Sequence, residues 1–427
     1  MSASFAITNA RLIDPASDHD APGGVLVEDG LIAQVGDDID LTGADEVIDA
    51  GGKVLAPALI DLRCAKEAAL TPDGETLPSL AASAAAGGFG SIVLAPNASA
   101  PLDKADGFAG MSRGFAHYPV RIYSAAGATR ALAGTEMSEL GLMARGGAVY
   151  AGHGDHTISD SKTLRRVMSY ASQFDLWLAL RPADPALSQG TVATESDWSS
   201  RFGLPAEPTI SERIAIDRDA SIAALTGGKL MIDRVSTREG LSAIRQARKR
   251  DLEIAATCAI AHMTLNEVDA GALDSAFRID PPLRLEDDRR ALVEAVADGE
   301  IDAIVSDHRP TPFDDKGEPF ALAIAGTLSL ETLLGALLGL VHEGELTLLQ
   351  ALRPLTCGPA DLLGLPQGRL RAGAPADLVL IDGDKPWVCD PAEFRSPRGN
   401  SAWSRRRFSG QVTQTFVDGR RIHNYNA

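Results

Sequence analysis

The middle of the chain alternates short apolar runs with longer amphipathic runs. Eight apolar runs have the length of buried strands, and they occupy residues 56–63, 91–97, 120–126, 147–152, 176–182, 229–236, 253–260 and 302–308. Helical runs separate or follow them, among them residues 79–88, 161–174, 218–228, 237–250, 286–299 and 323–346. Strands that alternate with helices predict parallel βαβ units, and eight such units predict a (β/α)8 barrel.

Both ends of the chain show a different pattern, in which apolar and polar residues alternate over short stretches. FAITNARLI, GVLVEDG and LIAQVG lie near the N-terminus, and DLVLID and GQVTQTFVDGRRI lie near the C-terminus. Chain ends often lie close together, so one small sheet domain can form from both. We therefore expect an α/β protein: a TIM-type (β/α)8 barrel at 55–365, plus a small β-sandwich domain built from both termini, 1–54 and 366–427.

Composition narrows the class of protein. The formal net charge of −18 disfavours nucleic acid as a partner, because phosphate contacts need a basic surface. No stretch approaches the roughly 20 apolar residues of a membrane span, and the N-terminus does not read as a signal peptide. Four cysteines lie far apart without a C-x-x-C pair, which is typical of reduced thiols. We expect a cytoplasmic protein that binds neither nucleic acid nor membrane.

Several segments, in order and at matching spacing, carry a family resemblance. They are APALIDLRCAKEAAL, GGFGSIVLAPNASAP, STREGL, DPPLRLEDDRRAL, GEIDAIVSDHRP and CGPADLLGLPQGRLRAGAPADLVLID. Together they resemble the dihydroorotase branch of the cyclic amidohydrolase family over nearly the whole chain. The resemblance implies a metal, usually zinc, that activates a water to attack a cyclic amide. It also implies ligands at the carboxyl ends of barrel strands, where barrel active sites form.

The family's ligands are a His-x-His pair at strand 1, a carboxylate at strand 4, histidines at strands 5 and 6, and an aspartate at strand 8. The residues that align with these positions are Arg63, Ala65, His153, Arg181, Arg234 and Asp307. A guanidinium has no lone pair for a metal, and an alanine side chain has no donor atom. Only Asp307, the family's general base, is clearly retained, so the resemblance predicts an inactive site with no metal.

The family's substrate contacts are also changed. Asn97 is retained, whereas Glu67, Asp280 and Thr311 replace an arginine, an asparagine and a histidine of the family pattern. Glu67 reverses the charge of the group that grips the substrate carboxylate. The combined loss of metal ligands and substrate contacts favours the hypothesis that this protein no longer catalyses the family's reaction.

The three arginines suggest what fills the former metal pocket. Arg63, Arg181 and Arg234 are all expected to point toward Asp307 from neighbouring strand ends. We therefore hypothesise that guanidinium charge replaces metal charge and neutralises Asp307, since an unpaired buried charge costs several kcal/mol. A related hypothesis is that this arginine-lined pocket binds a small anion.

A rearranged metal site is the alternative. Its ligands would come from His153, Asp155, His156, Asp307 and His308, with Cys64 as a further candidate. It would hold zinc and sustain an active cyclic amidohydrolase, a dihydroorotase that hydrolyses the cyclic amide of dihydroorotate. The expectation that His153 and His156 are exposed loop histidines argues against this site.

The leading hypothesis is a non-catalytic dihydroorotase homologue of pyrimidine biosynthesis. The resemblance implies the catalytic subunit of aspartate transcarbamoylase as its partner, in a hetero-oligomer or homo-oligomer. Such a role would retain the barrel and the small β domain while releasing the metal ligands.

Overall fold

The computed structural model describes residues 4–65, 74–311, 316–397 and 400–425. Its centre is a sheet of eight parallel strands, in the order of neighbours β6 (Leu59–Cys64), β7 (Phe89–Leu94), β8 (Arg121–Gly127), β9 (Ala148–Gly152), β10 (Leu178–Leu180), β13 (Leu230–Ile232), β14 (Ile254–Ala259) and β15 (Ala303–Val305). The last strand returns to the first, because the Ala65 N–H donates to the His308 carbonyl at 2.9 Å. Each of the eight predicted strands is present, and the predicted barrel is confirmed.

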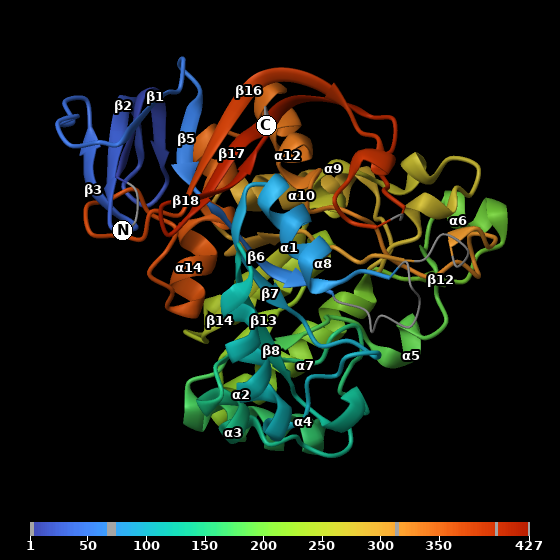
Figure 1. Cartoon of the computed structure of the whole chain (residues 1–427). Helices are drawn as coiled ribbons and strands as arrows, with labels where there is room; N and C mark the ends of the chain where they lie inside the picture. Colours follow the sequence, from blue (N-terminus) through green and yellow to red (C-terminus); the bar gives the residue numbers. More distant parts are fainter. Residues whose placement is uncertain (1–3, 66–73, 312–315, 398–399, 426–427) are drawn as a thin grey trace.

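Amphipathic helices pack around the barrel (Figure 1). They are α1 (Leu77–Ala86), α2 (Ala105–Gly114), α3 (Leu140–Arg145), α4 (Ser161–Ala171), α7 (Ile210–Thr226), α8 (Arg238–Arg248), α10 (Glu286–Ala297) and α12 (Leu333–His342). Their apolar faces join the outward side chains of the strands in one core, in which Leu80, Leu164 and Leu241 are buried. Shorter helices lie in the connections and after the barrel: α5 (Pro185–Ser188), α6 (Asp197–Phe202), α9 (Ile260–Thr264), α13 (Leu348–Leu352) and α14 (Cys357–Leu363).

The helix predicted over residues 323–346 is shorter than its apolar pattern suggested. Helix α12 begins at Leu333, ten residues into the predicted run. The preceding residues form turns and irregular backbone, and Thr327 forms a bridge with His308 beside the last barrel strand. Leu328 and Leu330 are buried there without belonging to a helix, so hydrophobicity alone could not separate the two cases.

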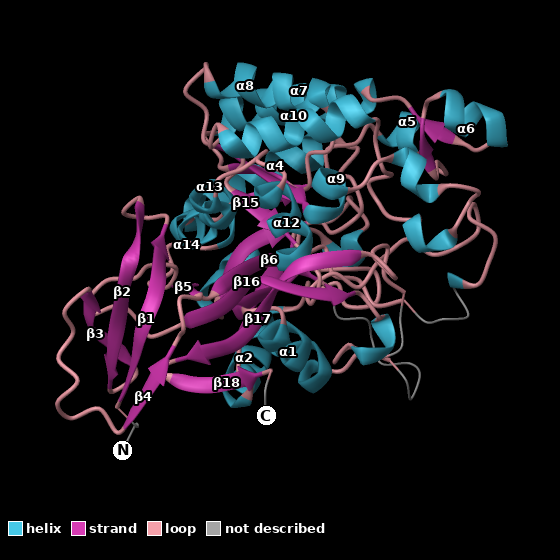
Figure 2. Cartoon of the chain, turned by 90° about the horizontal axis from the view of Figure 1, so that it is seen from above, coloured by secondary structure: helices cyan, strands magenta, loops and turns pink. Residues whose placement is uncertain are grey.

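Both termini build one antiparallel-rich sheet beside the barrel (Figure 2). Its strands are β1 (Phe5–Asp14), β2 (His19–Glu28), β3 (Leu31–Gly36), β4 (Glu46–Asp49), β5 (Val54–Pro57), β16 (Leu378–Val388), β17 (Arg407–Val417) and β18 (Arg420–Asn424). Strand β5 pairs with β16, with Leu55 opposite Leu380, and so joins the two ends of the chain. A separate core supports this domain, with Phe5 stacked on Phe416. The small β domain from both termini is confirmed, while its exact boundaries stay predictions.

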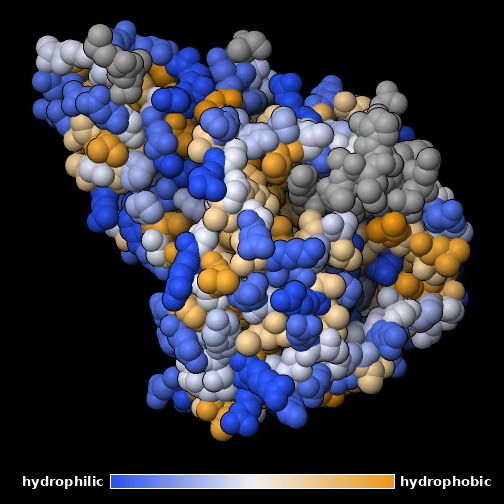
Figure 3. Space-filling view, turned by 60° about the horizontal axis from the view of Figure 1, so that its bottom comes forward, coloured by the Kyte–Doolittle hydropathy of each residue, from blue (hydrophilic) through white to orange (hydrophobic). Residues whose placement is uncertain are grey.

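The surface hydropathy, the helix lengths and the burial of the cysteines can be compared with the expectations from composition. On the face shown in Figure 3, apolar side chains lie in small groups among hydrophilic ones. Within the described ranges, no helix combines the length and the apolar character that crossing a bilayer requires. All four cysteines are free and buried, as expected for structural thiols.

Candidate functional site: a guanidinium–carboxylate network

The carboxyl ends of four barrel strands carry the residues of this site. Arg63 lies at the end of β6, Arg181 directly follows β10, and Arg234 and Asp307 lie two residues beyond β13 and β15. Arg234 and Asp307 have positive φ angles of 64° and 48°. A left-handed residue directly after a strand turns the chain sharply and costs about 1 kcal/mol or more for a non-glycine residue. The surrounding contacts hold this strain in place.

Arg63 reaches three carboxylates. Its Nε donates to Asp307 Oδ1 at 2.9 Å, its Nη1 to Asp233 Oδ2 at 2.7 Å, and its Nη2 to Asp155 Oδ1 at 2.6 Å. The Arg63 side chain is only 10% exposed. A planar guanidinium has five N–H donors in a fixed fork, so it can bind carboxylates on several sides at once.

Arg234 binds the same carboxylates from the other side. Its Nη1 donates to Asp307 Oδ2 at 3.0 Å and to the Asp280 carbonyl at 2.7 Å. Its Nη2 donates to Asp155 Oδ1 at 2.8 Å. The other oxygen of this carboxylate, Oδ2, accepts a hydrogen bond from Arg309 Nη1 at 2.8 Å. Both oxygens of Asp307 and both oxygens of Asp155 therefore accept from guanidinium groups.

Arg181 lies at the edge of the network. Its Nη2 donates to Asp280 Oδ1 at 2.6 Å, and it is Asp280, through its carbonyl, that connects this pair to Arg234. Arg181 therefore does not lie against Asp307 as hypothesised. The Nε atoms of Arg181 and Arg234 are buried and have no hydrogen-bond acceptor among the described residues.

The network balances its own charge. Four guanidinium groups face four carboxylates, namely Arg63, Arg181, Arg234 and Arg309 with Asp155, Asp233, Asp280 and Asp307. Burial alone would raise the pKa of Asp155, but Arg309, Arg234 and Arg63 outweigh it and hold that pKa well below its usual range. At Asp280, burial is likewise outweighed, chiefly by Arg181, and the pKa is lowered. Asp155 and Asp280 are therefore ionised at neutral pH.

A catalytic metal does not fit these residues. Zinc needs about three protein ligands with free lone pairs, and guanidinium groups provide none. Within the described part of the chain, no group of three or more histidine, cysteine, aspartate or glutamate side chains is placed to hold a metal ion. A divalent cation would have to displace several guanidinium groups from the carboxylates that already bind them.

The histidines proposed for a rearranged site are engaged elsewhere. His153 is fully buried, so the expectation of an exposed loop histidine is wrong for this residue, whereas His156 is exposed. His153 Nε2 bonds to Thr129 Oγ1 at 2.8 Å and Nδ1 to the His156 carbonyl at 3.1 Å. Burial lowers the pKa of His153 to about 4, which leaves the ring neutral. The apolar packing and Thr129 explain its burial.

His308 and Cys64 are also bound to other partners. His308 Nδ1 accepts from the backbone N–H groups of Ser329 and Leu330 at 3.2 and 3.3 Å, and Nε2 donates to Ser396 Oγ at 3.1 Å. The Cys64 thiol donates to a backbone carbonyl, and burial raises its pKa well above the usual value. The structure does not bring the proposed ligands of a rearranged site together.

The positions assigned to substrate contact have local roles in this structure. Asn97 Oδ1 accepts from the Ser99 and Ala100 N–H groups at 3.0 and 2.9 Å, which closes the turn after β7. Thr311 is buried, and Ala65 lies at the barrel seam. Glu67 lies outside the described residues. Their assignment as former substrate positions stays a prediction.

Two members of the network were not singled out from the sequence. Asp233 and Arg309 are chain neighbours of the flagged residues, in the segments MIDRVST and SDHRP. The signal that could have found them is their position at strand ends, where side chains from separate strands converge. The sequence shows these charged neighbours of the predicted site residues, but it does not show the direction in which their side chains point.

The comparisons with known proteins agree with this fold. The family model described as "Amidohydrolase family" matches residues 143–422, and the chain belongs to the amidohydrolase family. Among its relatives, the dihydroorotase of Anaeromyxobacter dehalogenans strain 2CP-1 is 34% identical, covering 99% of this chain and 98% of the relative. The dihydroorotase of Syntrophotalea carbinolica is 36% identical and covers 97% of each. The chain is thus a full-length homologue of dihydroorotases.

Solved structures match the architecture at low identity. An L-hydantoinase from Arthrobacter aurescens superposes with a TM-score of 0.89 at 23% identity, covering 99% of this chain and 96% of that one. A D-hydantoinase from a Thermus species gives a TM-score of 0.84 at 19% identity, with coverage of 99% and 96%. At this identity the likeness establishes the shared fold.

Proposed function

We propose that this chain is a non-catalytic dihydroorotase homologue of pyrimidine biosynthesis, and that it serves as a structural partner of the catalytic subunit of aspartate transcarbamoylase. One observation carries the loss of catalysis: both oxygens of Asp307 accept from guanidinium groups, those of Arg63 and Arg234. A general base must be free to take a proton from the attacking water. In this structure each oxygen of that carboxylate already accepts a hydrogen bond from a buried guanidinium group, so neither oxygen is free to receive the water.

The partner comes from the resemblance described above. Full-length similarity to dihydroorotases supports a fold kept intact, with its barrel and its small β domain. A protein kept for assembly needs its surfaces and its stability, and the charge-balanced network supplies stability where a metal would otherwise bind. The proposal accounts for an ordered pocket without ligands for zinc.

An activity assay tests the loss of catalysis. Hydrolysis of dihydroorotate and cyclisation of carbamoyl aspartate are measured with and without added zinc, beside the dihydroorotase of A. dehalogenans as the positive control. We expect rates equal to the buffer background in both directions. Zinc-dependent turnover that a chelator abolishes would establish the second candidate, an active metal-dependent cyclic amidohydrolase like the dihydroorotase of A. dehalogenans.

A separate experiment tests the partner. The purified chain is mixed with the aspartate transcarbamoylase catalytic subunit of the same organism, and the mass of the mixture is measured by light scattering after size exclusion. We expect a complex heavier than either component. Two unshifted peaks at micromolar concentrations would remove the assembly role while leaving the activity result untouched.

A further inference from the structure

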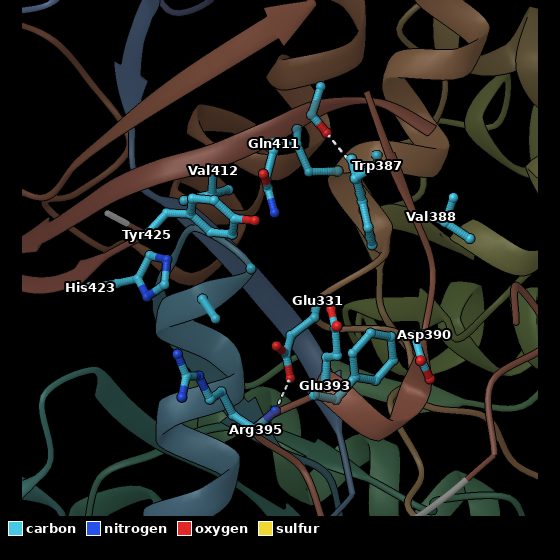
Figure 4. Close-up of a pocket in the computed structure, with 16 residues that line it drawn as sticks. Glu331, Trp387, Val388, Asp390, Glu393, Arg395, Gln411, Val412, His423 and Tyr425 are labelled. Atoms are coloured by element: carbon cyan, nitrogen blue, oxygen red, sulfur yellow. Dashed lines mark hydrogen bonds between the residues drawn. The ribbon is translucent and has the colours of Figure 1, made fainter. Parts of the chain in front are cut away.

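A cavity lies between the C-terminal end of α1, the N-terminal end of α12 and the strands β16, β17 and β18. Its volume is about 370 Å³, the size of a small organic molecule, and it shares no lining residue with the arginine network. Figure 4 shows Gln411 and Tyr425 on one side of the opening and Glu331 on the other. Segments separated by more than 300 residues in the sequence meet here, because Gly87, the C-cap residue of α1, lines the same cavity as His423 of β18.

Hydrogen-bond acceptors mark the polar part of the cavity. Glu331 is held in place by the Arg395 N–H at 2.7 Å and the Ser83 hydroxyl at 3.0 Å. Gln411 adds a further polar side chain to the lining.

The charge and the aromatic surface of the lining favour a cation. Glu331, Asp390 and Glu393 provide three carboxylates, against the single guanidinium of Arg395. Burial lowers the pKa of His423, so this ring is neutral at pH 7. The lining also contains aromatic rings, contributed by Trp387, Phe394 and Tyr425. Aromatic faces attract ammonium and guanidinium groups with about 0.5–2 kcal/mol.

We propose that this cavity binds a small organic cation, an amidine, guanidine or primary amine on a compact body. Its N–H groups donate to Glu331, and its body lies against Trp387. The site is independent of the proposed function, since none of its residues belongs to the network at the strand ends.

Three ligands of one shape and different charge test the proposal. Benzamidine is a cation, benzamide its neutral counterpart and benzoate an anion, and each is titrated into the full-length protein by calorimetry at pH 8. We expect benzamidine to bind at least tenfold more tightly than the other two. Equal affinities for benzamidine and benzamide, or no heat from benzamidine at millimolar concentrations, would overturn the proposal.

Matched variants locate the binding. Glu331→Gln keeps the side-chain size and should weaken benzamidine at least tenfold, which corresponds to about 1.4 kcal/mol. Gln411→Ala gives an independent second test if the first variant alters the fold. Asp384→Asn is the control, because Asp384 is an exposed carboxylate on β16 outside the lining. Affinity unchanged in Glu331→Gln, or lost equally in the control, would contradict the assignment.

The pH dependence gives a further readout. Burial raises the pKa of Glu331 to about 7, so the carboxylate loses its charge as the pH falls from 8 to 6. The other titratable or charged groups that line the cavity are Asp390, Glu393, Arg395, His423 and Tyr425. Benzamidine should bind about tenfold more tightly at pH 8 than at pH 6, because about a tenth of a group with pKa 7 is ionised at pH 6. Affinity independent of pH would contradict the role of Glu331.

Discussion

Replacing Asp307 with asparagine removes one charge from the centre of the network and changes little else. Asparagine has nearly the same size and tolerates a positive φ, here 48°, better than alanine does. The substitution leaves Arg63 and Arg234, whose side chains are 10% and 1% exposed, each short of one carboxylate. Any loss of stability therefore reports the charge rather than backbone strain.

The magnitude follows from burial. Removing one partner of a buried ion pair costs about 3–5 kcal/mol, because the remaining charge is left uncompensated. Asp307 is itself 21% exposed, and the amide oxygen of asparagine still accepts one hydrogen bond. We therefore expect Asp307→Asn to lower the free energy of unfolding by about 2–4 kcal/mol.

Urea unfolding followed by far-ultraviolet circular dichroism measures this change. The matched control is Asp18→Asn, since Asp18 also has a positive φ but forms an exposed pair with Arg353, with exposures of 78% and 43%. Exposed pairs contribute about 0–1 kcal/mol, so the control should hardly shift the unfolding midpoint. Equal small shifts in both variants, at an unchanged dependence on urea, would refute the stabilising role of the network.

Three further predictions concern pH and metal. Because Asp155 and Asp280 have lowered pKa values, their contribution to stability is complete above the unfolded pKa of about 3.9 and is lost as the pH falls through the folded values. Urea midpoints measured from pH 6 to pH 3 should therefore drop steeply below about pH 4. A flat profile in that range would contradict the ion pairs. The pKa of Glu331 is instead raised to about 7, so its contribution to the free energy of unfolding falls as the pH rises from about 4.5 to 7. Glu331→Gln should remove this pH dependence, which is at most about 1.4 kcal/mol of unfolding free energy per pH unit. An unchanged pH dependence of stability would show that Glu331 ionises normally. Added zinc should leave the melting temperature unchanged, whereas specific binding to the folded state at a hundredfold excess over Kd would stabilise by about 2.7 kcal/mol and raise it.

Much of the architecture could be predicted because hydrophobic periodicity reflects burial directly. Each predicted barrel strand has its counterpart, and the alternating patterns at both termini meet where Leu55 pairs with Leu380. The contact of Arg63 and Arg234 with Asp307 could also be anticipated, because parallel strands in a closed barrel end at one face.

The remaining features depend on the directions in which side chains point, and the spacing of residues along the sequence does not determine these directions. Arg181 turns to Asp280, 99 residues away in sequence, instead of reaching Asp307. His153 is buried because Thr129 and the packed strands enclose it, although its segment GHGDHT looks like an exposed loop. The cation cavity is built from distant segments and had no sequence signal. Tertiary packing, rather than local propensity, decided each of these cases.

Metal stoichiometry tests the central claim most directly. The protein is produced with ample zinc, desalted and measured by mass spectrometry, with a metal-containing dihydroorotase treated in parallel. A network of guanidinium groups in place of ligands predicts a zinc content near zero per chain in this protein and a clear signal in the control. A content near one or two per chain would contradict the account, and it would mean that the carboxylates bind a metal in preference to Arg63 and Arg234.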